Sequence, residues 1–235
     1  DVAGSATEGL IVALEVDGEP RGTAVAEATF AGVSDEALPG GSVALSPDGR
    51  LVAWLAGDDA IGVRGRPGGD AVFAVGGSVF WGSLVFSPDG AQLAFARRPA
   101  GGPTQIALLG LAEGTTRVLL EGRDPEAMAW SPDGRSLAVS LREYQQGGTV
   151  LEVLDVATAA RTELDRALAI DQALRWSPDG RRLAFVRWWY GYAVDLHVLE
   201  VGSGRSTVVD EQAHEATRPA WSPDGRRLAW TTGHA

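Results

Sequence analysis

The stretch AWSPDGRRLAW, residues 220–230, is the last of five copies of one phrase. The other copies are ALSPDGRLVAW (44–54), VFSPDGAQLAF (85–95), AWSPDGRSLAV (129–139) and RWSPDGRRLAF (175–185). Successive motif serines lie 41, 44, 46 and 45 residues apart, at Ser46, Ser87, Ser131, Ser177 and Ser222. A period of about 40–45 residues is that of one four-stranded propeller blade. The repeat therefore predicts an all-β fold built from small sheets.

Within the phrase, Pro-Asp-Gly has the chemistry of a tight turn between two strands. Pro sets φ near about −65°, Asp bonds nearby backbone N–H groups, and Gly takes a left-handed position that a Cβ disfavours. We predict a hairpin with a bulge at Gly, capped by the motif Ser. The motif aspartates occur once per repeat, so we interpret them as turn residues and not as catalytic or metal-binding groups: Asp48, Asp89, Asp133, Asp179 and Asp224.

The fourth repeat shows how one unit divides into strands. LRWS (174–177) and RRLAFVR (181–187) flank the turn, DLHVLEV (195–201) follows, and STVV (206–209) comes after the Gly-rich turn GSGR (202–205). Apolar and polar residues that alternate are typical of a half-buried strand. We therefore expect four antiparallel strands in each unit.

This pattern resembles the TolB-like and WD-type β-propeller repeat, whose blades carry WSPDG followed by LAF. The resemblance covers residues 43–235 through the five motifs, whereas residues 8–30 match only the later half of a unit. It implies that the phrase joins the innermost strand of each blade to the second strand. It also implies an exported or cell-envelope setting in a bacterium, either periplasmic or extracellular. The repeat is specific for the fold and unspecific for the function.

The two ends of the chain complement each other. The last motif unit has two strands and lacks the outer two, whereas VALEVDGEPR (12–21) compares with HVLEVGSGRS (197–206) and has no motif before it. We predict one domain, residues 1–235: a five-bladed β-propeller of four-stranded antiparallel blades, with the ring closed by N- and C-terminal strands that share one blade. Closure leaves only short, protected sheet edges. TolB-like relatives commonly have six blades, so the chain departs from that pattern, and the complementary ends predict that it is complete.

Composition excludes several classes of partner. The formal net charge is −11, and no basic run is longer than two residues. A nucleic-acid-binding protein needs a basic surface to neutralise phosphates, so we predict no nucleic-acid partner. There is no Cys, hence no disulfide and no thiolate metal site. No apolar run approaches the ~18–20 residues that span a bilayer, and no signal-peptide pattern opens the sequence, so we predict no membrane insertion.

Aromatic residues outside the repeat are better binding candidates than those inside it. Five tryptophans occupy repeat positions, where we expect them to pack the blades: Trp54, Trp130, Trp176, Trp221 and Trp230. The other aromatics lie in SVFWGS (78–83), REYQQGG (142–148) and RWWYGYAV (187–194). In propellers such loops share the face opposite the SPDG turns, and loops on a rigid scaffold concentrate binding residues.

Trp, Tyr and Arg are also the residue types enriched in binding hot spots. The predicted ligand-binding residues are Trp81, Tyr144, Trp188, Trp189, Tyr190, Tyr192, Arg142 and Arg187. The same face is expected to carry Arg97, Arg98, Arg123 and His214. The alternative is that these aromatics extend hairpins or cover the mouth of the channel.

Catalytic and metal-binding signals are weak. The histidines His197, His214 and His234 lack the spacing of metal ligands, and we expect His197 to be packed or solvated. No nucleophile elbow or Gly-rich phosphate loop occurs. Glu126 and Asp171, just before two innermost strands, are the only reasonable carboxylate pair for glycoside hydrolysis. We predict no catalytic residue, no metal and no cofactor, and an enzyme is the less favoured alternative.

The leading hypothesis is a non-enzymatic, monomeric module or scaffold that binds a protein or peptide on the aromatic, Arg-rich loop face. One alternative is a glycan-binding or glycoside-hydrolase-type propeller, because stacked Trp and Tyr also suit sugar rings. Another is the sensor ectodomain of a bacterial membrane protein. A sugar site needs an inward carboxylate or several polar groups beside the aromatics, whereas a protein site needs a wider patch.

Overall fold

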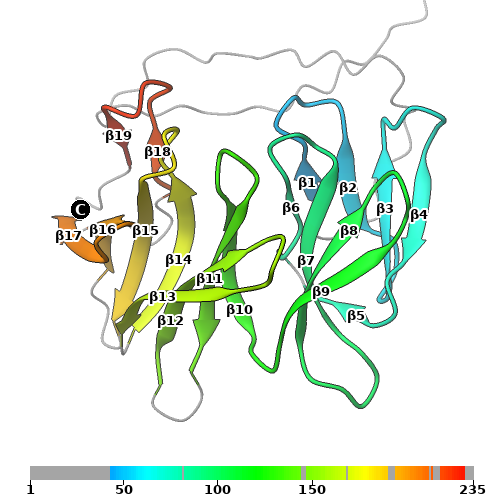
Figure 1. The fold of residues 1–235 in the computed structure, drawn as a ribbon, viewed down its shortest axis with the longest axis horizontal. Helices are drawn as coiled ribbons and strands as arrows, with labels where there is room; N and C mark the ends of the chain where they lie inside the picture. The colour runs from blue at the N-terminus through cyan, green and yellow to red at the C-terminus, as the bar shows by residue number, and fades with distance from the viewer. Residues whose placement is uncertain are drawn as a thin grey trace, which may run out of the picture. The chain divides into compact units, whose positions relative to one another are not determined.

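The computed structural model of the chain describes residues 43–80, 82–143, 147–167, 169–189, 194–211, 213 and 218–230. These residues all fall within one unit, residues 37–235. They form strands, turns and irregular segments, with no helix among them. The strands of each sheet follow one another in chain order, so the chain builds one antiparallel sheet after another (Figure 1).

Three sheets have four antiparallel strands each. Sheet A contains β1 (Val43–Leu45), β2 (Val52–Leu55), β3 (Ala60–Arg64) and β4 (Ala71–Ala74). Sheet C contains β10 (Pro125–Trp130), β11 (Ser136–Arg142), β12 (Thr149–Asp155) and β13 (Arg161–Ala167). Sheet D contains β14 (Ala169–Trp176), β15 (Arg182–Trp189), β16 (Val194–Glu200) and β17 (Arg205–Asp210).

Sheets B and E depart from this pattern. Sheet B contains β5 (Ser78–Val79), β6 (Val85–Phe86), β7 (Gln92–Arg98), β8 (Gln105–Gly110) and β9 (Thr116–Glu121). Both β5 and β6 pair with β7, so the first strand of this sheet is interrupted. At the interruption, the Ser83 hydroxyl accepts a hydrogen bond from the Ala96 N–H (3.1 Å). Sheet E contains, within the described residues, β18 (Ala220–Trp221) and β19 (Leu228–Ala229).

The SPDG motif joins the first strand of each sheet to the second, as predicted. The five motif glycines have φ between 68° and 69°, the left-handed region that Gly adopts without strain. Each motif Ser hydroxyl donates to the Asp carboxylate at 2.5–2.6 Å and accepts the N–H of the fifth residue after it at 2.9 Å. The hydrogen bond from Ser lowers the pKa of each motif Asp below its usual value, and a backbone N–H lowers it further. The motif is therefore a capped turn, and its carboxylates have a structural role.

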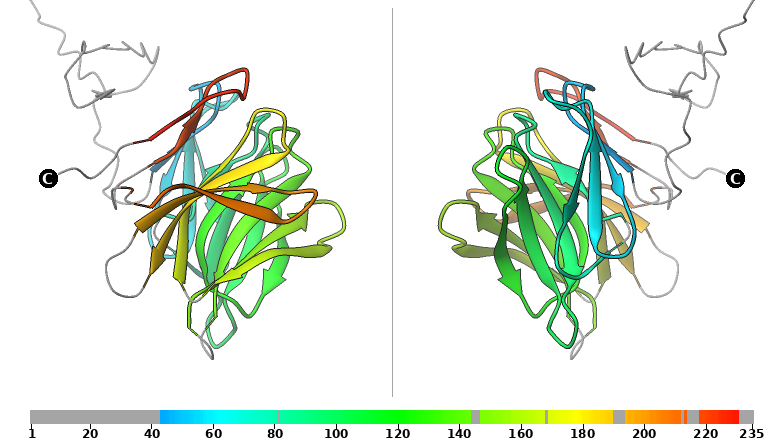
Figure 2. Two further views of the ribbon diagram at one scale, coloured as in Figure 1. Left: turned by 90° about the vertical axis from the view of Figure 1, so that its left-hand side faces the viewer. Right: turned by 90° about the vertical axis from the view of Figure 1, so that its right-hand side faces the viewer.

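The apolar core is divided into layers between neighbouring sheets. One cluster joins sheets A and B, a second joins B and C, a third joins C and D, and a smaller one joins D and E. The first strands contact one another in chain order: β1 with β6, β6 with β10, β10 with β14 and β14 with β18. The sheets twist as their strands run outward (Figure 2). Sheets B, C and D thus pack against a neighbouring sheet on each face, whereas sheets A and E each have one such neighbour within the described residues.

Three motif tryptophans also connect neighbouring sheets by hydrogen bonds. In each case the indole N–H donates to a backbone carbonyl of the preceding sheet, at the position two residues before that sheet's motif Ser. The pairs are Trp130 to Val85 at 3.0 Å, Trp176 to Ala129 at 3.0 Å and Trp221 to Arg175 at 3.1 Å. The prediction that these side chains pack the sheets is confirmed, and the repeated indole explains why Trp precedes the motif Ser.

Two sequence expectations about strand ends are wrong. RWWYGYAV was expected to be a connecting loop, but β15 continues through Trp189 because Trp188 and Trp189 pair with Ile170 and Ala169 of β14. Glu126 and Asp171 were expected to precede innermost strands, but they lie within β10 and β14. In both places the strands are longer than the apolar pattern indicates, because backbone pairing extends into polar and aromatic sequence. The described residues contain no helix long and apolar enough to cross a membrane.

Candidate binding site

The candidate site is the end of sheets B, C and D that lies opposite the SPDG turns, here called the loop end. At this end the second strands finish: β7 at Arg98, β11 at Arg142 and β15 at Trp189. Arg98 and Arg142 both lie eleven residues after their motif Ser, so the repeat places them at equivalent positions. The loop end therefore presents cations at corresponding places on neighbouring sheets.

In sheet B, Arg98 is held by its surroundings on three sides. Its Nη2 lies 3.1 Å from Asp124 Oδ1, and its Nε donates to Thr104 Oγ1 at 3.2 Å. The Thr104 hydroxyl donates in turn to Asp124. The guanidinium also lies 5.2 Å from the centre of the Phe80 ring, within the range of a cation–π contact. Asp124 thus ties the end of the second strand to the segment that enters sheet C.

In sheet C, Arg142 forms an ion pair with Glu126, the second residue of β10. Its backbone N–H also donates to the Asp124 carbonyl at 2.9 Å. Arg142 is therefore a fixed cation at the surface, and Glu126 is neutralised by it. A carboxylate engaged in this way is poorly suited to act as a general acid or nucleophile.

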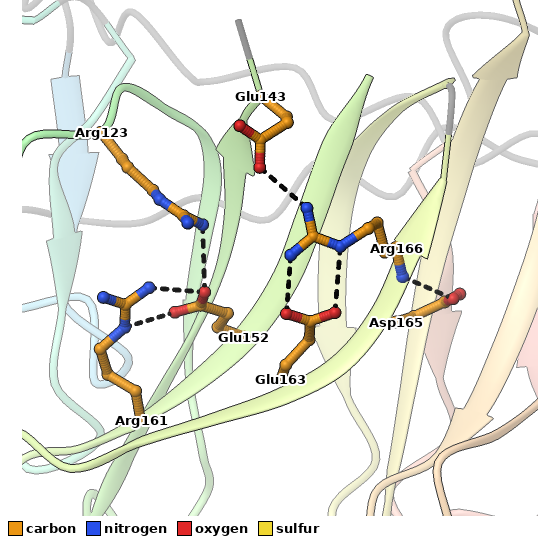
Figure 3. Close-up of polar contacts among 7 residues, drawn as sticks. All are labelled: Arg123, Glu143, Glu152, Arg161, Glu163, Asp165 and Arg166. Carbon is orange, nitrogen blue, oxygen red and sulfur yellow. Dashed lines mark hydrogen bonds and ion pairs between the residues drawn. The ribbon is translucent and has the colours of Figure 1, made fainter. Parts of the chain in front are cut away.

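The outer strands of sheet C carry two ion-pair groups (Figure 3). In the first, Glu152 is only 3% exposed and accepts hydrogen bonds from Arg161 Nε (2.8 Å) and Nη2 (2.6 Å). Arg123 Nη1 approaches the same carboxylate at 3.2 Å. The two guanidiniums compensate the charge of the buried carboxylate. Without such partners, a buried carboxylate would pay its desolvation cost uncompensated.

In the second group, Arg166 lies between two carboxylates. It contacts Glu143 at 2.8 Å and Glu163 at 2.9 Å. Glu163 pairs with Glu152 in the register of β12 and β13, yet it is far more exposed. The hydrogen bond from Arg166 lowers the pKa of Glu163 below its usual value. The two groups therefore place similar charges in very different environments.

Arg187, a predicted binding residue, joins two sheets. Its Nη2 lies 2.8 Å from Asp165 Oδ2 of sheet C, and the residue is only 6% exposed. The guanidinium lies 5.2 Å from the centre of the Phe185 ring and 5.9 Å from that of Trp189. Arg187 is accordingly placed to orient its neighbours more than to touch a partner directly.

His197 packs behind Arg187 in sheet D. Its ring stacks on Phe185, with centroids 5.3 Å apart and planes inclined by 12°. Its Nδ1 lies 3.2 Å from Ser206 Oγ. Burial lowers the pKa of His197, and the positive charge of Arg187 lowers it further, while Asp195 and Asp165 oppose the shift. His197 is therefore a packed, neutral ring at neutral pH. This agrees with the expectation that His197 is packed or solvated.

The two tryptophans at the end of β15 differ in environment. Trp189 is 39% exposed, and its indole N–H donates to Asp195 Oδ2 at 2.6 Å. Trp188 packs partly buried beside Val186 and Leu196 in the layer between sheets D and E. The structure thus brings Trp189 together with Arg187 and Asp195, whereas Trp188 contributes to packing.

The remaining predicted site residues are outside the described part of the chain: Trp81, Tyr144, Tyr190 and Tyr192. His214 also lies outside it. Within the described residues, no group of three or more His, Asp or Glu side chains is arranged to hold a metal ion. The sequence reasoning missed the acids that fix the site, Asp165 and Asp195, because their partners are defined only by pairing between strands and sheets.

The second half of the chain matches a known protein family. Residues 124–235 match the family model described as the TolB beta propeller domain. This part of the chain is similar to the TolB β-propeller family. The resemblance carried by the SPDG motifs is thereby confirmed. The motifs of sheets C, D and E all lie within the matched segment.

Solved structures show the same fold. TolB from Acinetobacter baumannii is 20% identical with a TM-score of 0.60, and the match covers 80% of this chain and 47% of that protein. A protein assigned as TolB from Agrobacterium tumefaciens is 20% identical with a TM-score of 0.63, and the match covers 81% of this chain and 68% of that protein. An oligogalacturonate lyase from Vibrio parahaemolyticus is 11% identical with a TM-score of 0.59, and the match covers 80% of this chain and 56% of that protein.

The likeness to these structures concerns the fold alone. The chain spans about half the length of the Acinetobacter TolB. A search of curated proteins finds no match to the sequence. The described sheets are those of a TolB-like β-propeller.

Proposed function

We propose that this TolB-type propeller is a non-enzymatic binding module that holds a protein or peptide at its loop end. The supporting observation is Trp189, an exposed indole whose N–H is fixed by Asp195 at 2.6 Å and whose ring lies beside Arg187. An exposed aromatic that is already held in place loses little entropy on binding, and Trp is a frequent hot-spot residue. Arg142, at the equivalent end of sheet C, contributes a second fixed group.

The test uses a phage-displayed library of random peptides, selected against the wild-type protein. We expect enriched peptides to bind Trp189→Ala at least about 30-fold more weakly, because hot-spot truncations cost about 2 kcal/mol or more. The measurement is the dissociation constant by fluorescence polarisation with the selected peptides.

The matched control is Val72→Ala, which removes an exposed apolar side chain from sheet A. Its affinity for the same peptides should equal that of the wild type. If the peptides bind Trp189→Ala and the wild type with equal affinity, Trp189 is not part of the binding site and the proposal is contradicted.

A glycan is the second candidate ligand at the same place. It is favoured by the Asp195 carboxylate, a polar group held directly beside the exposed indole. Sugar binding commonly combines stacking on an aromatic ring with hydrogen bonds to carboxylates. A glycan array probed with the wild type and with Trp189→Ala distinguishes this candidate, which requires a signal that the variant loses.

We further propose that residues 1–235 form one five-bladed propeller whose last blade is completed by residues 10–28. Two observations support this closure. Sheet E has two strands within the described residues, and the first strand of sheet A, β1, carries the exposed apolar side chains Val43 and Leu45. A fifth complete blade between sheets E and A would cover such side chains.

Engineered cysteines test the closure in this cysteine-free chain. By analogy with the pairing of Ala184 and Val198 in sheet D, the alignment of 12–21 with 197–206 pairs Ala13 with Ala229. The double variant Ala13→Cys, Ala229→Cys should form an intramolecular disulfide on mild oxidation, because paired residues bring Cβ atoms within disulfide range. The control Ala13→Cys, Leu228→Cys is one residue out of register and should stay reduced. Equal cross-linking of both variants, or of neither, contradicts the proposed closure.

The setting that we propose is the bacterial envelope or the space outside the cell, where the module acts as a monomer, either alone or as the sensor ectodomain of a membrane protein. The support is the TolB-type repeat, together with the TolB structures from two bacteria. Detection of the protein only in the cytosol after fractionation of its source bacterium would overturn this setting.

A further inference from the structure

Two grooves lie on the opposite side of the molecule, between neighbouring SPDG turns. The larger has a volume of about 430 Å³ and lies between sheets C and D, with Ser136, Trp176, Asp133, Asp179 and Gly180 among its lining residues. The smaller, of about 340 Å³, lies between sheets B and C and is lined by the corresponding Gln92, Trp130, Asp89, Asp133 and Gly134. Each groove therefore combines the indole of one sheet with two carboxylates and a motif glycine.

The next junction, between sheets D and E, shows what fits such a groove. There Arg182 lies with its guanidinium 4.6 Å from the centre of the Trp221 ring. Its Nη2 donates to the carbonyl of Gly225, the motif glycine of sheet E, at 2.6 Å. A cation stacked on an indole and bonded to a carbonyl is a favourable arrangement for a guanidinium. The chain thus fills its own groove with an arginine at this junction.

The residue that decides how each groove is filled is the fifth after the motif Ser. This position is Leu51 in sheet A, Gln92 in sheet B, Ser136 in sheet C and Arg182 in sheet D. Its backbone N–H is fixed by the motif Ser in every sheet, so its side chain starts from the same place. Leu51 reaches the motif glycine of the next sheet, as Arg182 does. Ser136 is the shortest side chain of this set, which leaves the groove over Trp176 open.

We propose that the groove over Trp176 binds the guanidinium of an arginine side chain presented by another protein or peptide. The Trp176 ring takes the place of Trp221, and the Gly180 carbonyl takes the place of the Gly225 carbonyl. Asp133 and Asp179 add negative charge at the rim, and the hydrogen bonds from Ser131 and Ser177 lower the pKa of these carboxyls and keep them ionised. This surface is separate from the loop end, so it goes beyond the function proposed above.

The first test uses two short peptides as probes, acetyl-Gly-Arg-Gly-amide and the same peptide with citrulline in place of arginine. Citrulline has nearly the same shape and no charge, so the pair isolates the guanidinium. In protein with ¹⁵N-labelled tryptophan, the indole N–H signal of Trp176, assigned with Trp176→Phe, reports on the groove. We expect a saturable shift with the arginine peptide at roughly millimolar concentration, and at least about tenfold weaker binding of the citrulline peptide. Equal shifts from both peptides, or no saturable shift, would overturn the proposal.

The second test exchanges the residues that fill and open the grooves. Ser136→Arg should place a guanidinium over Trp176, as Arg182 does over Trp221, and abolish the shift of the Trp176 signal. Arg182→Ser should do the reverse, so that the arginine peptide now also shifts the Trp221 signal. Thermal melts establish that each variant is folded. Retained binding in folded Ser136→Arg, or no response of Trp221 in folded Arg182→Ser, contradicts the assignment of the guanidinium to this groove.

Discussion

Trp176→Ala is expected to destabilise the fold by about 3–5 kcal/mol, the usual cost of truncating a packed Trp to Ala. The ring packs against the layer between sheets C and D, beside Phe185 and Leu183. Truncation leaves a cavity there and also removes the hydrogen bond from the indole to the Ala129 carbonyl. The measurement is the free energy of unfolding in urea, with a variant at the other end of the sheet as reference.

That reference is Trp189→Ala, for which we expect a cost below about 1 kcal/mol, since the side chain is 39% exposed and its removal opens no enclosed cavity. Trp188→Ala should fall between the two variants, because Trp188 packs partly buried between sheets D and E. Trp188 and Trp189 therefore do not form one exposed pair, contrary to what their adjacency in the sequence suggests. A loss of stability in Trp189→Ala as large as that in Trp176→Ala would show that Trp189 belongs to the core.

Glu152→Ala is expected to lower the free energy of unfolding by about 2–3 kcal/mol. Removal of the Glu163 carboxylate, at the paired position on β13, should lower it much less. The Glu152 carboxylate neutralises Arg123 and Arg161, so its loss leaves two guanidiniums close together without their shared anion. Breaking a fully buried pair costs about 3–5 kcal/mol. Here both arginines reach solvent, which reduces the cost.

The matched control is Glu163→Ala, which removes a carboxylate at the paired position on β13. Its side chain is 48% exposed, and surface ion pairs contribute only about 0–1 kcal/mol. Urea unfolding of the two variants gives the comparison. Equal costs would mean that the burial of Glu152 has no energetic consequence.

The repeat made much of the fold predictable from the sequence. The turn chemistry of Ser-Pro-Asp-Gly is local, so the hairpin, the left-handed glycine and the serine cap all follow from adjacent residues. The role of Trp176 as a packing residue was predictable because it recurs at Trp130 and Trp221. Its hydrogen bond to Ala129 was not, because that carbonyl lies 47 residues away and its position depends on how the sheets stack.

The candidate site was less predictable, for a related reason. RWWYGYAV (187–194) was expected to be a connecting loop, yet pairing with β14 extends β15 through Trp189. The predicted binding residue Arg187 is buried because Asp165, on another sheet, lies opposite it. Environments of this kind depend on contacts between sheets, which neither periodicity nor composition reveals.

The indole hydrogen bonds give the junction between sheets a direction. Each motif Trp donates toward the preceding sheet, and each sheet from B to D offers a carbonyl to the one that follows. The contact is thus heterologous, like a head-to-tail interface between subunits, and such contacts close into rings only when the rotation per unit allows it. One unit can therefore be added or removed without redesigning the junction. The number of blades in a propeller is then set by how many units close the ring, and not by the junction between two units. Proteins that share one repeat are therefore free to differ in that number.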